Sequence, residues 1–304
     1  MNSKLLEECV DDWIVAMEIT NVSKHTITAY KSDVLCFLEY CKEKNFSLPD
    51  LELSDMRDYV VHCLEVKRNT PKSVKRYIAS IRSFMNWMVA ESKLHHNPVE
   101  DVKIKRTGRT IPVVVSQDDM NILLDQPDPI LNAEIWLWKR DKAMMEVMYS
   151  SGVRVGELVN LDLKDIQIKN KLIRINKGKG GKDRVIPLGR KACEAINEWL
   201  IFRQEKNPSN TKLFINQHGN SITIQQVRNR VIKQAQRAGL DAKVFPHLFR
   251  HCFATHMLSA SNDLRAVQEM LGHKDISSTE VYTHADFETL ARAYDNFHPR
   301  AFKQ

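Results

Sequence analysis

The segment at residues 95–116, HHNPVEDVKIKRTGRTIPVVVS, limits the possible folds most strongly. It holds two prolines, a glycine and several basic residues, and it lacks the helical periodicity of the residues before it. The chain has 304 residues, which is long for a single hydrophobic core. We therefore predict a first domain at residues 1–106, a linker at 107–115 and a second domain at 116–304.

The first domain is expected to be helical. Apolar residues repeat at helical spacing after the cap residues Ser23 and Thr26, again after Ser54, and again from Pro71 onward. Between Lys67 and Arg82 there are six basic residues and no acidic one. This stretch is either a solvated helix face or a phosphate-facing helix. The candidate phosphate contacts are Lys72, Lys75, Arg76 and Arg82.

The second domain is expected to be mostly helical with a small antiparallel β-sheet. Short β-type runs at 172–175 and 184–188 flank a Gly- and Lys-rich turn and predict a hairpin. A helix starting after Ser116 and a buried helix at 136–150 precede the hairpin. The helices expected after it are at 191–204, 223–238, 248–260 and 263–271.

Charge is unevenly distributed along the chain. Residues 1–106 hold 16 Lys and Arg against 16 Asp and Glu, so the net charge of +7 comes from the remaining 29 basic and 22 acidic residues. A basic second half favours a polyanionic partner. The sequence has no apolar run of membrane-spanning length, no secretory signal and no CxxC pair. We expect a cytoplasmic protein with reduced thiols, and neither metal nor cofactor.

Four clusters in the second half carry side chains suited to chemistry. They are SGVRVGELVNL with Arg154, KGKGGKDR with Lys179, PHLFRHCFATHML with His247 and Arg250, and LGHKDISSTEVYTH with His273 and Tyr282. Each cluster alone has an ordinary structural explanation, such as a surface ion pair, a turn or a packed tyrosine. Their order and their closeness along the chain make the combination far more specific than any one of them.

Together these clusters resemble the tyrosine recombinase, or phage-integrase-like, family. Its signature is an Arg, a hairpin Lys, a His-x-x-Arg, a later His and a C-terminal Tyr, and Arg154, Lys179, His247, Arg250, His273 and Tyr282 occupy those places. GKGGKDRVIPLG, the terminal HPRA and SKHTITAYKSDVLCFLEY resemble the Xer recombinases that resolve chromosome dimers. Ser151 and Phe249 depart from the usual Thr and Leu, at positions outside the signature.

The resemblance implies DNA cleavage through a covalent 3′-phosphotyrosine at Tyr282. Arg154 and Arg250 would clamp the non-bridging phosphate oxygens, and His273 would add a donor. No metal or ATP is implied, because the covalent link conserves the bond energy. Glu157, one turn after Arg154, fits a supporting role better than acid catalysis.

The remaining two signature residues would transfer protons. The resemblance assigns protonation of the leaving 5′-oxygen to Lys179, although Lys177 and Lys182 are close enough to be confused with it. His247 would assist proton transfer at the tyrosine.

The implied partner is double-stranded DNA at a specific site, bound by a homo- or hetero-tetramer on two DNA sites. The resemblance also implies a paired recombinase and a DNA-translocase activator as partners. It implies no association with a membrane. On the helix expected at 223–238, Arg230, Lys233 and Arg237 form a basic face that could enter the major groove, with a solvated face as the alternative.

A further apolar stripe follows Tyr282 at helical spacing: Phe287, Leu290, Ala291, Tyr294 and Phe297. The resemblance implies that this tail docks into a neighbouring protomer, whereas packing against its own domain is the alternative. With docking in a neighbour, deletion of residues 287–304 would leave half-site binding largely intact, weaken cooperative binding to a full site and abolish strand exchange.

Three other functions are compatible with parts of the pattern. An integrase of a phage or mobile element shares the signature but often carries an extra arm-binding domain. A type IB topoisomerase shares the chemistry but relaxes DNA without site specificity. A non-catalytic architectural DNA-binding protein would keep the basic surfaces and lack part of the catalytic set, which argues against it here.

Overall fold

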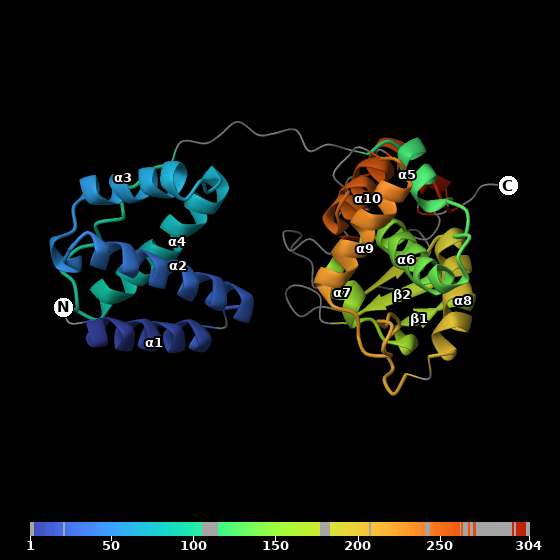
Figure 1. The fold of residues 1–304 in the computed structure, drawn as a ribbon, viewed down its shortest axis with the longest axis horizontal. Coiled ribbons are helices and arrows are strands. Elements are labelled where there is room, and N and C mark those ends of the chain that lie inside the picture. Colours follow the sequence, from blue (N-terminus) through green and yellow to red (C-terminus); the bar gives the residue numbers. More distant parts are fainter. Residues whose placement is uncertain are drawn as a thin grey trace. The chain divides into compact units, whose positions relative to one another are not determined.

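The chain folds as two compact units, Met1–Thr110 and Ile111–Gln304 (Figure 1). The structure is a computed structural model, and it describes residues 3–20, 22–104, 115–176, 183–206, 208–240, 244–261, 263, 267, 270–271, 294 and 296–301. The predicted linker lies almost wholly outside these residues, so its bounds stay a prediction.

The first unit is helical. Its elements are α1 (Ser3–Ile19), α2 (Lys24–Glu43), the 3-10 turn η1 (Leu48–Asp50), α3 (Leu53–Val61), the π-helical turn η2 (His62–Val66) and α4 (Pro71–Ala90). Ser23 caps α2 by accepting the backbone N–H of Thr26, as predicted. The expectation that Ser54 opens the next helix was wrong by one residue, because a reciprocal cap formed by Glu52 and Asp55 starts α3 at Leu53.

Helices α1, α2 and α4 pack against one another around an aromatic core. Trp13 meets Phe84 edge to face at 5.3 Å between ring centroids, and Phe37 meets Tyr59 in the same way at 5.0 Å. All four rings are buried. The apolar stripe read from the sequence of α4 therefore faces this core, and its basic residues lie on the other faces of the helix.

The second unit is mostly helical with a small sheet, which confirms the predicted fold class. In order it contains α5 (Gln117–Leu124), α6 (Asn132–Ser151), α7 (Val155–Asn160), η3 (Leu163–Asp165), β1 (Ile166–Gln167), η4 (Ile168–Asn170), β2 (Leu172–Ile175), β3 (Arg184–Pro187), α8 (Arg190–Gln204), α9 (Ile224–Arg237) and α10 (Pro246–Ser261). No described helix of either unit is long and apolar enough to cross a membrane.

The sheet is an antiparallel meander in the order β1-β2-β3. Strands β2 and β3 form the predicted hairpin, with Ile173 opposite Ile186 and both side chains buried. Strand β1 was not predicted, because two residues are too short to show an alternating pattern. The hairpin places Arg184, the first residue of β3, opposite Ile175 at the end of β2.

Helix α6 is the centre of the second unit and packs against α8, α9 and α10 (Figure 1). Met144, Met145 and Met148 are fully buried, and Trp136 meets Trp199 of α8 edge to face at 5.1 Å. The predicted buried helix at 136–150 is thus confirmed. Because α6 is enclosed on several sides, the polar residues on it need partners from neighbouring elements.

The last described residues, 294 and 296–301, pack against their own unit. The hydroxyl of Tyr294 lies 2.5 Å from Oγ of Ser150, which also accepts the backbone N–H of Gly189 at 2.7 Å. The ring of His298 stacks on Tyr294 at 4.7 Å, and its Nε2 lies 3.2 Å from the carbonyl oxygen of Tyr149. Tyr294 and His298 are both buried.

Arg300 completes this packing with charge. Its guanidinium donates to the buried carboxylate of Glu146 in α6 and to Asp125 at the end of α5. Residues 294 and 298–301 therefore pack in cis, which is the alternative that the sequence left open, and docking of the tail into a neighbouring protomer stays a prediction. Phe297 is partly exposed, and Phe287, Leu290 and Ala291 lie outside the described residues.

Candidate active site

Arg154 lies between α6 and α7, directly before the first residue of α7. Gly152 ends α6 in the left-handed region at φ +60°, and a Cβ there would lie 2.6 Å from the Phe253 ring, so glycine is required on both counts. The backbone N–H of Arg154 donates to Oε2 of Glu157 at 2.7 Å, and its Nη1 donates to Oε1 at 3.1 Å. One carboxylate therefore holds both the backbone and the side chain of Arg154.

A second arginine holds the same carboxylate. Arg184 donates from Nη1 and Nη2 to the two oxygens of Glu157 at 3.0 and 2.8 Å, which is a bidentate pair. Burial acts to raise the pKa of Glu157, but the hydrogen bonds and charges of Arg184 and Arg154 outweigh it and hold that pKa below its usual value. Glu157 is thus ionised at neutral pH, which suits a supporting residue and not a general acid.

Arg250 enters from α10. It donates to the carbonyl oxygens of Gly152 at 2.6 Å and Leu271 at 2.8 Å, which uses two of its five N–H donors. Burial, and then the positive charges of Arg154 and Arg184, lower the pKa of Arg250 to about 10. The guanidinium stays protonated at neutral pH. Its hydrogen bond to Gly152, two residues before Arg154, and the Glu157 carboxylate shared by Arg154 and Arg184 bring the three arginines to one site.

The charges of Arg154, Arg184, Arg250 and Glu157 do not cancel. Three guanidinium groups against the single carboxylate of Glu157 leave a net charge of +2. Planar guanidinium groups bind phosphate oxygens in pairs, and a phosphoryl transition state gains negative charge on those oxygens. This arrangement can therefore hold a phosphodiester and stabilise it during attack.

His247 lies one helical turn before Arg250 in the first turn of α10, and its side chain is exposed. Leu248, Phe249 and Cys252 are buried and fix this helix against the core. The described parts of the chain contain no cluster of His, Cys, Asp or Glu suited to a metal ion.

The structure brings together Arg154 and Arg250 of the predicted catalytic set. Lys179, with its alternatives Lys177 and Lys182, lies outside the described residues, as do His273 and Tyr282. Their roles stay predictions.

Arg184 was missed by sequence reasoning. Its only signal was its position at the start of the second hairpin strand, just after the Lys-bearing turn.

The basic residues of α4 differ in their exposure to solvent and in their contacts within the protein. Lys72 and Lys75 are exposed. Arg76 pairs with the buried Asp33 at 2.9 Å but keeps 44% of its side chain exposed. Arg82 donates to the carbonyl oxygens of Val99 and Val102, which ties α4 to the segment after it.

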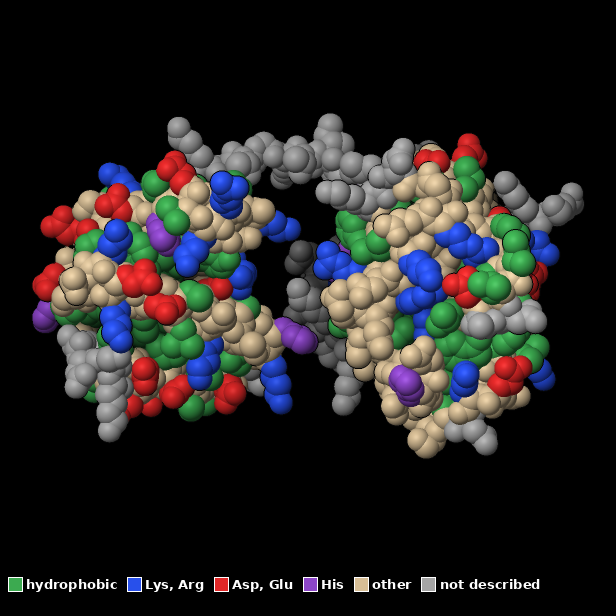
Figure 2. Space-filling view, viewed as in Figure 1, with side chains coloured by type: hydrophobic (Ala, Val, Ile, Leu, Met, Phe, Trp, Pro, Cys, Tyr) green, Lys and Arg blue, Asp and Glu red, His purple; other side chains and the backbone are tan. Residues whose placement is uncertain are grey.

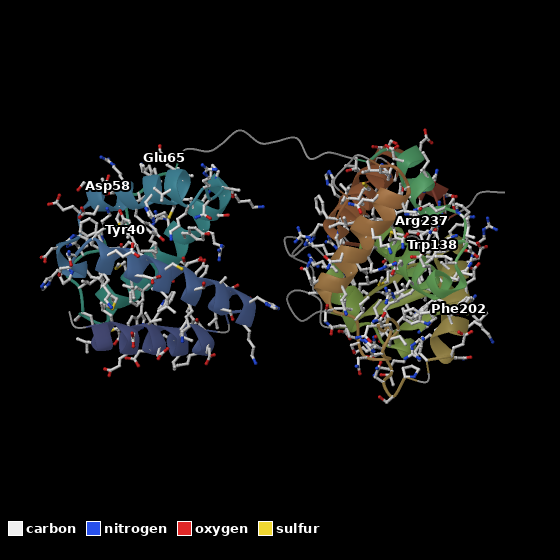
Figure 3. All side chains as sticks on the ribbon, in the orientation of Figure 1. Tyr40, Asp58, Glu65, Trp138, Phe202 and Arg237 are labelled. Carbon is white, nitrogen blue, oxygen red and sulfur yellow. The ribbon has the colours of Figure 1, made fainter. Side chains whose placement is uncertain are left out.

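The residues of the basic face predicted on α9 contact α6 and the segment before it, while Lys233 and Arg237 stay exposed to solvent. Arg230 donates to the buried Asp141 at 2.6 Å, and Lys233 lies 3.5 Å from Glu134. Arg237 donates to the carbonyl oxygen of Pro127 and lies over the Trp138 ring at 4.9 Å (Figure 3).

Entry of this basic face into the DNA major groove stays a prediction, and the pairings show that Arg230 is the least exposed of its three residues. Figure 2 shows blue Lys and Arg side chains gathered in the middle of this view of the second unit.

Two family comparisons cover most of the chain. Residues 114–289 match the phage integrase family, and residues 10–92 match the phage integrase N-terminal SAM-like domain. The chain belongs to the phage integrase family. It is a Xer-like tyrosine recombinase, and its helical first unit and its catalytic second unit are the two domains of that family.

Two relatives named tyrosine recombinase XerC agree with this family assignment. The recombinase is 40% identical over 281 residues to tyrosine recombinase XerC of Pseudomonas putida, covering 92% of each chain. It is 40% identical to XerC of Proteus mirabilis over 237 residues, covering 77% of this chain and 75% of that one. A crystal structure of XerH site-specific recombinase bound to palindromic difH substrate matches with a TM-score of 0.70 at 23% identity, over 90% of this chain and 80% of that one, and shows the fold.

The protein is therefore an enzyme that carries out site-specific recombination. The three arginines of the candidate site, Arg154, Arg184 and Arg250, lie within the residues that match the family.

Proposed function

We propose that this recombinase cuts and rejoins double-stranded DNA at a specific site through a covalent 3′-phosphotyrosine at Tyr282. The observation that supports it most is the convergence of Arg154 and Arg250, from the start of α7 and from α10, on one place with a surplus of positive charge. A surplus of this kind has little structural use, because like charges repel at short range. It is useful when a phosphate is present.

In this proposal each residue has one task. Arg154 and Arg250 bind the non-bridging oxygens of the scissile phosphate, and His273 adds a donor. Tyr282 attacks in line and becomes joined to the 3′-phosphate, while Lys179 protonates the leaving 5′-oxygen. His247 assists proton transfer at the tyrosine, and its exposed position in the first turn of α10 leaves it accessible to substrate.

The first unit would add contacts to the DNA backbone. Lys72 and Lys75 are exposed on α4, and Arg76 is half exposed beside them. Phosphate contacts of this type position a protein on the duplex without reading its sequence. Arg82, Arg230 and Arg237 are committed to contacts within the protein, and Lys233 is exposed but paired with Glu134.

The biological role that fits best is resolution of chromosome or plasmid dimers in the cytoplasm. The 40% identity to XerC over 92% of the chain favours this role over integration of a phage or mobile element. A tetramer on two DNA sites would follow, because two duplexes must be cut and exchanged in ordered pairs. A paired recombinase and an activating DNA translocase are part of the same proposal.

One assay separates this function from its rivals. The binding site is first located by a genome-wide footprint, and two direct copies are cloned on a supercoiled plasmid. A recombinase excises the segment between them, whereas a topoisomerase relaxes the plasmid whether or not the sites are present. Relaxation of a site-free plasmid without excision, or binding without any strand cleavage, would reject the proposed function.

A further inference from the structure

Arg184 stands out among the charged residues around the phosphate clamp. Its side chain is 9% exposed, and it begins β3, on the hairpin and not on the helices that carry the clamp arginines. Its two terminal nitrogens grip both oxygens of Glu157. Arg184 does not share a helix turn with Glu157, so this pair is a tertiary contact between the sheet and α7.

The carboxylate of Glu157 lies between two guanidinium groups. Each of its oxygens accepts from both arginines: Oε1 from the Nη1 atoms of Arg154 and Arg184, and Oε2 from the Arg154 backbone N–H and Nη2 of Arg184. A carboxylate free of Arg184 could rotate and become a full bidentate partner of Arg154. With Arg184 in place, its orientation is fixed, and Arg154 keeps donors for another anion.

Charge leads to the same conclusion. Glu157 carries one negative charge, and Arg184 can neutralise it, which leaves the positive charge of Arg154 uncompensated. Without Arg184, Arg154 would be neutralised by its own neighbour on α7. The effect on a bound phosphate would be the loss of one of the two charges that clamp it.

The fold does not fully satisfy Arg184. Its buried Nε has no hydrogen-bond partner in the part of the chain that the structure describes. An ion pair kept only for stability gains little over a well-packed apolar pair, and an unsatisfied donor lowers that gain further. The cost is easier to understand if the guanidinium serves the reaction.

We propose that Arg184 is a positioning residue for recombination: it holds Glu157 so that Arg154 presents its guanidinium and its full charge to the scissile phosphate. The proposal rests on the function proposed above, in which Arg154 is a clamp for that phosphate. Arg184 acts through Glu157 and Arg154, and it needs no contact with DNA itself.

The test is a double-mutant cycle on cleavage of a nicked suicide half-site under single-turnover conditions. The variants are Arg184→Gln, Arg154→Lys and the two combined. Arg174→Gln is the matched control, because Arg174 lies on the partner strand β2 and pairs with Asp183 at the surface, with 58% of its side chain exposed. Half-site binding by gel shift and thermal denaturation accompany each variant.

We expect Arg184→Gln to bind the half-site within about twofold of the unchanged protein and to cleave it at least about tenfold more slowly. Arg174→Gln should cleave normally. The double variant should be no slower than Arg154→Lys alone, since both changes remove the same interaction. Arg184→Lys should recover part of the rate, because it restores the charge without the bidentate geometry.

Several outcomes would overturn the proposal. Multiplied losses in the double variant would mean that Arg184 acts independently of Arg154, and cleavage by Arg184→Gln at the control's rate would mean that it does not act at all. If both Arg184→Gln and Arg184→Lys melt early and lose half-site binding, the pair is purely structural. Normal cleavage by Arg154→Lys alone would instead refute the proposed phosphate clamp, which separates the two failures.

Discussion

Glu146 and Arg300 form a buried ion pair that joins the middle of α6 to the C-terminal residues of the second unit. The side chains are 1% and 4% exposed, and Arg300 donates to both carboxylate oxygens. Burial raises the pKa of Glu146, and Arg300 opposes that rise. The pair explains how an acidic residue is tolerated in a helix that packs against α8, α9 and α10.

Removing one partner of this pair should be costly. Arg300→Met leaves an unpaired buried carboxylate, and we expect it to lower the free energy of unfolding by about 3–5 kcal/mol. A carboxyl whose pKa is raised by folding is favoured in its protonated form, so its contribution to stability is lost as pH rises through the folded-state pKa. The deficit of Arg300→Met should therefore grow from pH 5 to pH 8.

Urea denaturation of the variant across this pH range measures the effect. Glu146→Gln combined with Arg300→Met is the control, because it removes the charge and should be both more stable than Arg300→Met at pH 8 and less sensitive to pH. Equal stability of the single and double variants at pH 8 would contradict the explanation.

Tail deletion should now have a different outcome from the one that the sequence favoured. Deletion of residues 287–304 removes Tyr294, His298 and Arg300, which pack in cis, so we expect a destabilised second unit and weakened half-site binding. A deletion of residues 302–304 removes none of the described contacts and serves as the control. Thermal denaturation and half-site gel shifts compare the two, and a normal melting temperature for the longer deletion would refute the cis anchor.

Removing one oxygen atom tests whether Tyr282 is the nucleophile. Tyr282→Phe removes the attacking oxygen and keeps the ring, so we expect normal site binding and no covalent protein–DNA complex. A suicide substrate followed by denaturing gel electrophoresis detects the complex. Covalent trapping of the Phe variant would show that another residue attacks.

The phosphate clamp depends on geometry as well as charge. Arg154→Lys and Arg250→Lys keep the positive charge and lose the planar pair of donors. We expect each to slow cleavage by roughly a hundredfold or more, on the scale of losing one donor to a transition-state oxygen. Single-turnover rates at saturating protein measure this, and near-normal rates would assign these arginines a structural role.

The general acid can be identified through the leaving group. If Lys179 protonates the 5′-oxygen, then Lys179→Ala should cleave poorly and be rescued selectively by a 5′-bridging sulfur, which leaves without a proton. The same substrate is tested with Lys177→Ala and Lys182→Ala. Rescue of one of these in place of Lys179→Ala would transfer the role to that lysine.

Elements with strong local patterns were predictable from the sequence. The hairpin strands, the buried helix α6 and the limits of α8 and α9 follow from periodicity and turn residues. Of the signature residues, Arg154 and Arg250 were predicted from their order along the chain, and the structure brings them together. Local pattern also placed Arg154 and Arg250 near helix starts, where the structure has them.

Tertiary partners were not predictable in this way. The periodicity of α9 shows that Arg230 and Arg237 share a face, but only the fold shows that this face meets Asp141 and Trp138 of α6. The polar run HPRA gives no sign of burial, because its burial depends on the distant Glu146. Sequence patterns show which side chains share a face of a helix or strand. Only the packing of the folded chain shows which residues that face contacts.

The hydrogen bonds at Ser150 have a consequence for the timing of synthesis. Gly189 can donate to the Ser150 hydroxyl once Gly189 has left the ribosome, but Tyr294 follows 105 residues later in the chain. At roughly 5–20 residues per second, a nascent chain waits about 5–20 seconds between the two contacts. During that interval α6 lacks both Tyr294 and Arg300, so a ribosome that stalls there holds a chain whose central helix is incompletely covered. Such chains should be preferred substrates for proteases and chaperones, although the helical first unit is already complete.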